Sequence, residues 1–321
     1  MPNNEMVVMS RAPIGQRRRK AKPKVVFVCD QPGWAYGIVS QNLALLLRRH
    51  FRVEIIYQTP ADRFKEQING DADVWIFHHI TVAAKYPKGR CLIKLSGNRS
   101  LKTYDDARRE AMLGGKHLVV LNDGLADVAN KYTPHITYIP NGLNVEQFKP
   151  RPKPAGSRFV VAFCANVDQP VRSIYKGFPY VAVACDELGV DLKVSSYRAD
   201  KGEPETPYSQ MPQFYNSASC LVHPSAGEGS SNAVMEALAS GIPVISTKTG
   251  FHGEKMTDGH NVLFVERSLA QIREAIDFLR QSPSECRRIG ENGRRFALAH
   301  HDLRKLAPKW KDAITKVLEE G

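Results

Sequence analysis

The segment 220–246 constrains the fold of this chain more than any other stretch. It opens with an apolar run that predicts a buried strand, followed by a turn of small residues. Ser231 or Asn232 can then cap a helix, which Gly241 terminates. The apolar residues 242–246 predict the next buried parallel strand. The segment therefore predicts a strand–helix–strand unit of an α/β domain.

Two glutamates bracket the start of this predicted helix, Glu228 in the turn and Glu236 inside the first turns. The free N–H groups at a helix start attract phosphate, and Gly229 would let a ligand approach the backbone closely. A nearby carboxylate can accept hydrogen bonds from ribose or sugar hydroxyls. The chemistry indicated is capture of a sugar nucleotide. The alternative is an ordinary strand–helix unit with two solvated glutamates.

These residues resemble the donor-site motif of glycosyltransferase family 4: two glutamates with seven residues between them, then Ala-Leu-Ala-Ser-Gly-Ile-Pro-Val-Ile-Ser. The resemblance implies two Rossmann-like domains facing a cleft, the GT-B arrangement. It also implies sugar transfer from a nucleotide sugar with retention and without a bound metal. In that reading Glu236 is a partly exposed carboxylate that holds the ribose, Glu228 contacts the sugar, and the backbone of Gly229, Ser230 and Ser231 holds the diphosphate.

A lysine, Lys176, matches the place where the family has Lys-Gly at a helix start, and it would neutralise the departing diphosphate. The family's Gly-Arg pair, about ten positions earlier, is replaced here by Ala165 and Asn166. Arg172 is therefore our candidate for the second phosphate cation.

The first half of the chain contributes two further candidates by resemblance. Gly33 occupies the position of the family's N-terminal glycine loop, where the backbone meets the donor phosphate. His78 and His79 follow a predicted strand where family members carry a histidine that faces the transferred sugar. The sequence does not decide between them, and we take His79 as the candidate.

Strands that alternate with helical stretches in both halves predict two doubly wound parallel sheets. A segment rich in proline and lysine, residues 149–157, indicates a linker between them. We therefore expect a disordered basic arm at residues 1–24, an acceptor domain at 25–150 and a donor domain at 151–301. By resemblance, we expect a C-terminal helix at 302–321 that packs back on the first domain.

The net charge of +12 is concentrated near the N-terminus. Residues 1–24 hold seven Lys and Arg residues against one Glu, which gives +7 − 1 = +6. Such an arm suits a polyanionic partner, either DNA, an anionic glycan or an anionic membrane surface. A passive solubilising tail explains the composition equally well.

The six cysteines are scattered, and the ten histidines show no metal-ligand spacing with them, so we expect no metal site and no cofactor. No apolar run is long enough to span a bilayer and the N-terminus lacks a signal-peptide core, so we expect a cytoplasmic protein without a transmembrane segment.

The function predicted from these observations is a retaining, metal-independent glycosyltransferase. Its acceptor is either a surface glycan or lipid-linked sugar, or a hydroxymethylated base in viral DNA. The alternative is a non-catalytic protein that binds sugar nucleotides or nucleic acid on a degenerate transferase scaffold. A Rossmann oxidoreductase is disfavoured because no Gly-x-Gly-x-x-Gly follows the first strand.

Overall fold

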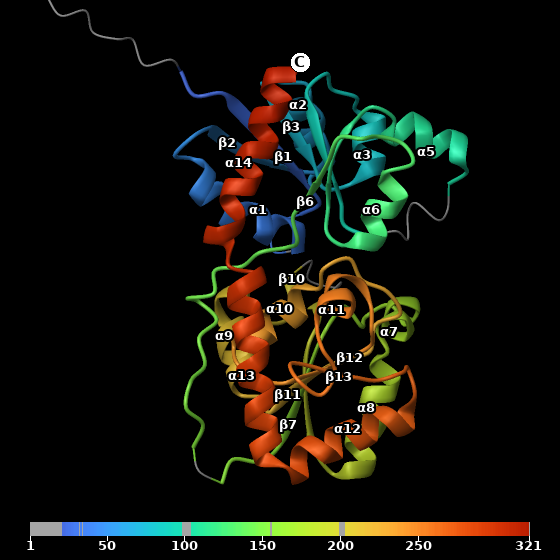
Figure 1. Cartoon of the computed structure of the whole chain (residues 1–321), viewed down its shortest axis with the longest axis vertical. Helices are drawn as coiled ribbons and strands as arrows, with labels where there is room; N and C mark the ends of the chain where they lie inside the picture. Colours follow the sequence, from blue (N-terminus) through green and yellow to red (C-terminus); the bar gives the residue numbers. More distant parts are fainter. Residues whose placement is uncertain are drawn as a thin grey trace, which may run out of the picture.

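The computed structural model describes residues 21–31, 33, 35–97, 104–154, 156–198 and 203–320. Most of the predicted basic arm, residues 1–20, lies outside these ranges. The described chain forms two α/β domains stacked one above the other, each with a parallel sheet and helices on its faces (Figure 1). The predicted fold class is confirmed.

The first domain has a six-stranded parallel sheet in the order β2-β1-β3-β4-β5-β6. The strands are short, and each crossover between consecutive strands passes through a helix, as parallel pairing requires. The strands are β1 (Lys24–Cys29), β2 (Arg52–Tyr57), β3 (Val74–Phe77), β4 (Cys91–Leu95), β5 (His117–Val120) and β6 (Ile136–Tyr138). The helices are α1 (Ala35–Leu47), α2 (Ala61–Ile68), α3 (Ile80–Lys85), α5 (Asp106–Leu113) and α6 (Asp123–Ala129), the last lying between β5 and β6.

The second domain has a five-stranded parallel sheet in the order β13-β12-β11-β7-β8. Its strands are β7 (Val160–Cys164), β8 (Asp191–Ser195), β11 (Cys220–His223), β12 (Val244–Ser246) and β13 (Leu263–Phe264), and β9 (Tyr197–Arg198) pairs with β10 (Glu203–Pro204) in a small antiparallel ribbon. The helices are α7 (Pro170–Lys176), α8 (Phe178–Leu188), α9 (Met211–Asn216), α10 (Asn232–Ala239), α11 (Gly250–Lys255), α12 (Leu269–Gln281) and α13 (Pro283–His300), with a short 3-10 turn at Tyr208–Gln210.

The helix α14 (Leu303–Glu320) leaves the second domain and runs along the first, as the red ribbon of Figure 1 shows. Its apolar face joins the core of the first sheet, where the Trp310 ring lies 6.3 Å from that of Phe27. At the crossing point a Cβ on Gly142 would lie 2.8 Å from the Leu306 side chain, so a larger residue there would displace this leucine. None of the helices in the described ranges is long and apolar enough to cross a membrane.

Candidate active site

A cavity of about 370 Å³ opens where the carboxyl ends of the two sheets face each other. Ligands of doubly wound sheets collect at this end of the strands. Both domains contribute to its lining, with Gly33, Tyr36, Ser96 and Asn141 from the first. From the second domain it includes the predicted residues Arg172, Lys176, Glu228, Gly229, Ser230, Ser231 and Glu236. The structure thus brings together every predicted site residue except His79.

The start of α10 points its free N–H groups into this cavity. Ser231 is the N-cap, and its Oγ accepts a hydrogen bond from the Val234 backbone N–H at 3.5 Å. The neighbouring Ser230 Oγ is buried and has no partner within the described protein. A buried hydroxyl without a partner at a helix start is suited to bind an anionic ligand group.

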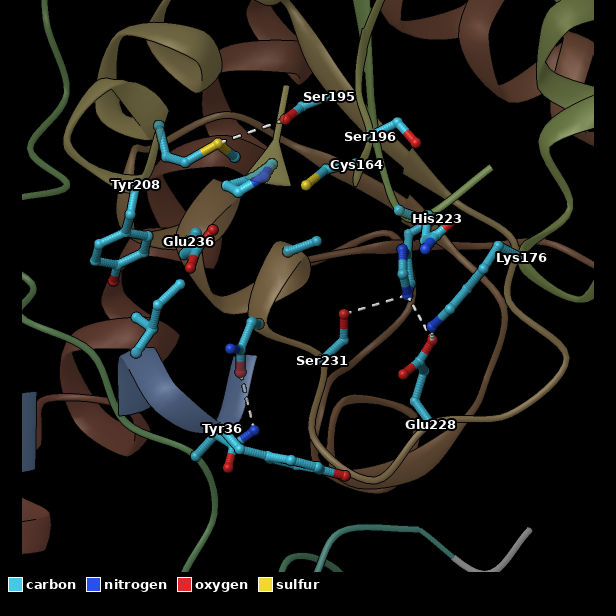
Figure 2. A pocket seen from close by; sticks show the side chains of 18 of the residues that line it. Tyr36, Cys164, Lys176, Ser195, Ser196, Tyr208, His223, Glu228, Ser231 and Glu236 are labelled. Atoms are coloured by element: carbon cyan, nitrogen blue, oxygen red, sulfur yellow. Dashed lines mark hydrogen bonds and ion pairs between the residues drawn. The ribbon is translucent and has the colours of Figure 1, made fainter. Parts of the chain in front are cut away.

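A compact ionic cluster lies on one side of this helix start (Figure 2). Lys176, at the end of α7, contacts Glu228 Oε1 at 2.5 Å, and the His223 ring Nε2 lies 3.0 Å from the same oxygen. Burial alone raises the pKa of Glu228, but the Lys176 ammonium and the hydrogen bond from His223 more than offset burial and lower it well below its usual range. Glu228 is therefore an anion that holds Lys176 at the cavity wall.

The other carboxylate, Glu236, lies on the opposite side of Ser231, beside Tyr208 (Figure 2). We predicted a partly exposed side chain, which is wrong: Glu236 is only 5% exposed, because α10 is buried on nearly all sides. Its Oε2 accepts a hydrogen bond from the Tyr215 hydroxyl at 3.0 Å. Burial raises the pKa of Glu236 to about 8, against the smaller lowering effect of Tyr215. In the unliganded protein Glu236 is therefore protonated at neutral pH.

The raised pKa of Glu236 predicts a pH-dependent stability. The neutral acid stabilises the fold fully below the unfolded pKa of 4.5, and this contribution is lost as the pH rises through about 8. Glu236→Gln cannot ionise, so its free energy of unfolding should exceed that of the wild type by a margin that grows from pH 5 to pH 9. Urea denaturation at several pH values measures the difference. A constant difference would show that Glu236 does not titrate in this range.

The close approach of the first domain requires a glycine at position 229, apart from any requirement that a ligand imposes. We expected this glycine to let a ligand approach, but a Cβ here would lie 2.0 Å from the carbonyl oxygen of Ser96, just after β4. Asn122 of the first domain also donates a hydrogen bond to the Gly229 carbonyl at 2.9 Å. The glycine therefore permits the two domains to close on each other at the site.

Gly229→Ala should hold the two domains apart and lower turnover on the order of 10²-fold, because displacement of about 1 Å is enough for such a loss. Gly89→Ala is the matched control, since a Cβ at Gly89 meets nothing within 4 Å. Donor hydrolysis at saturating donor gives the comparison, with thermal denaturation to confirm that both variants fold. Equal turnover in the two variants would refute the close approach.

The Asn141 side chain joins the first domain to the start of α10. Its Oδ1 accepts a hydrogen bond from the buried Lys94 ammonium at 2.7 Å, and its Nδ2 donates to the Ser230 carbonyl at 2.8 Å and to Asn232 Oδ1 at 2.9 Å. Its own carbonyl accepts from His301 Nδ1 at 2.7 Å.

Lys94 is a residue that sequence reasoning missed. It lies on β4, only 1% exposed, and burial lowers the pKa of its ammonium to about 7. The signal was present in the sequence, because a lysine inside the apolar run Cys-Leu-Ile-Lys-Leu has to find a partner in the core. Tyr215, the partner of Glu236, left no comparable signal.

The two predicted phosphate cations both lie beside the cavity. Arg172, on α7, lines it together with Asn166, the residue that replaces the family's arginine. Gly33 lines it from the first domain and adopts a φ of 79°, a left-handed conformation that favours glycine. Gly33 and Arg172 therefore both line the cavity, and their roles toward the phosphates stay predictions.

The two histidines after β3 do not line the cavity. His78 is buried, with its Nε2 2.7 Å from Ser40 Oγ. The His79 ring packs edge-on against Tyr36 at 5.0 Å, and Tyr36 is the side chain that reaches the cavity. His79 thus contacts Tyr36, a residue of the cavity wall, without lining the cavity itself, and its predicted role stays a prediction.

The expectation of no metal site stays a prediction, and one group of side chains away from this cavity bears on it. Among the described residues, His117, His135 and Glu320 lie close enough to share one ion. They come from distant parts of the chain, so their spacing in the sequence carried no signal. No comparable group is found among the described residues that line the cavity.

Sequence comparison finds relatives over part of the chain. An MMP alpha-(1->4)-mannosyltransferase of Mycolicibacterium hassiacum is 27% identical over 183 residues, which are 50% of this chain and 43% of that protein. An uncharacterized glycosyltransferase of Methanocaldococcus jannaschii is 33% identical over 91 residues, which are 28% of this chain and 26% of the relative. The match thus spans less than half of each curated relative.

Solved structures match over almost the whole chain. Sucrose-phosphate synthase from Thermosynechococcus elongatus has a TM-score of 0.76 at 14% identity, covering 94% of this chain and 100% of that chain. Anabaena HepE in complex with UDP and glucose has a TM-score of 0.68 at 15% identity, covering 91% and 99%. At this identity the likeness shows the fold.

Residues 204–296 match the family described as glycosyl transferases group 1, and this range includes both Glu228 and Glu236. The resemblance that the donor motif indicated is confirmed. Residues 204–296 are thus similar to the group 1 glycosyl transferases, and the two domains together have the GT-B fold.

Proposed function

We propose that this protein is a glycosyltransferase that takes a nucleotide diphosphate sugar as donor and a hydroxyl group as acceptor. The observation that carries the proposal is the meeting of Lys176, the start of α10 and Glu236 in one cavity between the domains. The lysine and the helix start provide positive potential for a diphosphate. Glu236, deeper along the helix, offers a hydrogen-bonding carboxyl group for the ribose.

The same geometry supports a reaction that uses no bound metal and no resident cofactor. Lys176 and Arg172 lie beside the cavity with the N–H groups of α10, and together they can stabilise the charge that grows on the departing diphosphate. Glu228 keeps the Lys176 ammonium at the wall. We therefore expect full activity in the presence of EDTA.

Retention of anomeric configuration is proposed from the resemblance. In the expected route the bond between the anomeric carbon and the phosphate oxygen breaks, and the acceptor oxygen bonds to the same face of that carbon. The acceptor proton passes to the leaving diphosphate, so no protein nucleophile is needed. Enzymatic product analysed by proton NMR gives the anomeric configuration directly.

The acceptor we favour is a sugar hydroxyl, because a relative over half of the chain is named as an alpha-(1->4)-mannosyltransferase, and a (1->4) linkage is formed to a sugar hydroxyl. A hydroxymethylated base in DNA is the second candidate, favoured by the +6 charge of residues 1–24. To distinguish the two acceptors, we would measure binding of the full chain and of residues 25–321 to DNA, anionic vesicles and neutral glycan across a salt series. If removal of residues 1–24 weakens binding to DNA alone, the result supports a base in DNA as the acceptor. The cytoplasmic location stays a prediction.

The test of the proposed function is donor hydrolysis with a panel of labelled nucleotide sugars, with and without EDTA. One donor should release its nucleoside diphosphate, and EDTA should leave the rate unchanged. Binding of a donor without hydrolysis, in the presence of every acceptor class, would favour the non-catalytic alternative. If EDTA abolished the activity and magnesium or manganese restored it, the reaction would need a metal. That result would refute metal independence and leave the proposed glycosyl transfer intact.

A further inference from the structure

A group of three potential ligands lies on the first domain at the edge of the sheet opposite to the cleft. His117 is the first residue of β5, and His135 immediately precedes β6. The parallel pairing of these strands places the two rings side by side, with the Leu118 N–H donating to the His135 carbonyl at 2.8 Å. Glu320, at the end of α14, completes the group.

The ligand atoms converge on one point. His117 Nε2 lies 3.0 Å and His135 Nδ1 lies 3.8 Å from Glu320 Oε2, and all three ligand atoms lie within 4.8 Å of one another. In a tetrahedral zinc site with bonds of about 2.0–2.1 Å, ligand atoms are about 3.3 Å apart. Small side-chain rotations are enough to reach that geometry.

The lysine beside the three ligands leaves the ligand oxygen, Glu320 Oε2, available to an ion. The nearby cation, Lys316, approaches the other carboxylate oxygen, Glu320 Oε1, at 3.6 Å. The exposed fractions of His117, His135 and Glu320 are 19%, 37% and 40%, so an ion can enter from solvent and a water can complete its coordination. Two imidazoles and one carboxylate are a set that zinc uses, whereas magnesium and calcium prefer oxygen ligands.

We propose that His117, His135 and Glu320 form a site for a divalent transition-metal ion of the zinc type, which fastens α14 to the sheet of the first domain. The ligands come from the first residue of β5, the residue before β6 and the end of the crossing helix. An ion bound here therefore adds a link between α14 and the first domain. The site lies at the amino ends of β5 and β6, away from the cleft, so it takes no part in the proposed transfer reaction.

The test is titration of the metal-free full chain with Zn²⁺ and with Co²⁺. We expect one ion per chain, a visible Co²⁺ spectrum of low coordination number, a rise in thermal midpoint of several degrees and slower amide exchange in α14. His117→Asn and Glu320→Gln should each weaken binding on the order of 100-fold or more. His50→Asn, which removes an exposed histidine elsewhere, is the matched control.

Two results would overturn the site. One is absence of stoichiometric binding to the wild type; the other is equal affinity in the wild type and in both ligand variants, which would place the ion on other side chains. Glu320→Gln changes a side chain near the helix end and should fold normally even if His117→Asn does not. None of these measurements depends on glycosyl transfer. Failure of the metal site and failure of the proposed function can therefore be distinguished.

Discussion

Lys176→Ala should lower the turnover of donor hydrolysis on the order of 10²–10³-fold, with a smaller effect on donor affinity. The reason is that negative charge on the leaving diphosphate grows in the transition state, so a cation beside it acts mainly there. Turnover at saturating donor and donor affinity by calorimetric titration separate the two effects. Unchanged turnover would transfer the role to Arg172.

The control for this experiment has to account for the partner of Lys176. Removing the lysine leaves the half-buried Glu228 carboxylate without its cation, which can destabilise the fold by itself. The double variant Lys176→Met with Glu228→Gln removes both charges, so it should regain stability without regaining turnover. Lys65→Ala, at an exposed position on α2, controls for loss of a surface lysine.

Glu236→Ala should weaken donor binding by about 1–3 kcal/mol, the contribution of two hydrogen bonds between neutral groups at about 0.5–1.5 kcal/mol each. Glu236→Gln should retain most of the affinity at pH 6, because the raised pKa of Glu236 makes the resident group a neutral acid that an amide resembles. Titration of both variants with the donor nucleotide at pH 6 and pH 9 is the measurement.

The comparison of the two variants decides which form of Glu236 binds the donor. Equal losses for alanine and glutamine at pH 6 would mean that donor binding requires the ionised carboxylate. Unchanged affinity in both variants would remove Glu236 from the site. Glu187→Ala, a partly exposed glutamate paired with Arg273 on the surface, serves as the control.

The donor side of the site could be predicted because its determinants are local. The turn at Glu228, the cap at Ser231 and the carboxyl group of Glu236 all belong to one strand–helix unit, whose geometry follows from its own sequence. Lys176 was identified from its Lys-Gly context, and the structure explains the glycine: a Cβ on Gly177 would lie 2.6 Å from the Pro224 carbonyl oxygen.

The remaining features depend on contacts between distant segments, which periodicity and spacing do not contain. The exposure of Glu236 was predicted from the pattern of α10 alone, whereas α9 and the neighbouring turn bury it. The role of Gly229 depends on Ser96 in the other domain, and the pairing of Lys94 with Asn141 joins β4 and the segment after β6 to the start of α10. His117, His135 and Glu320 meet only because α14 returns to the first domain.

The return of α14 also determines the order in which the protein can fold while it is being synthesised. The first sheet emerges early from the ribosome, but one of its apolar faces is completed by Leu306, Trp310 and Ile314. Until those residues are translated, the nascent first domain exposes part of its core. The second domain, continuous from β7 to α13, can fold first and hold the unfinished domain in reach of its missing helix. We therefore infer that a translational pause before residue 303 would prolong a state that needs chaperone protection.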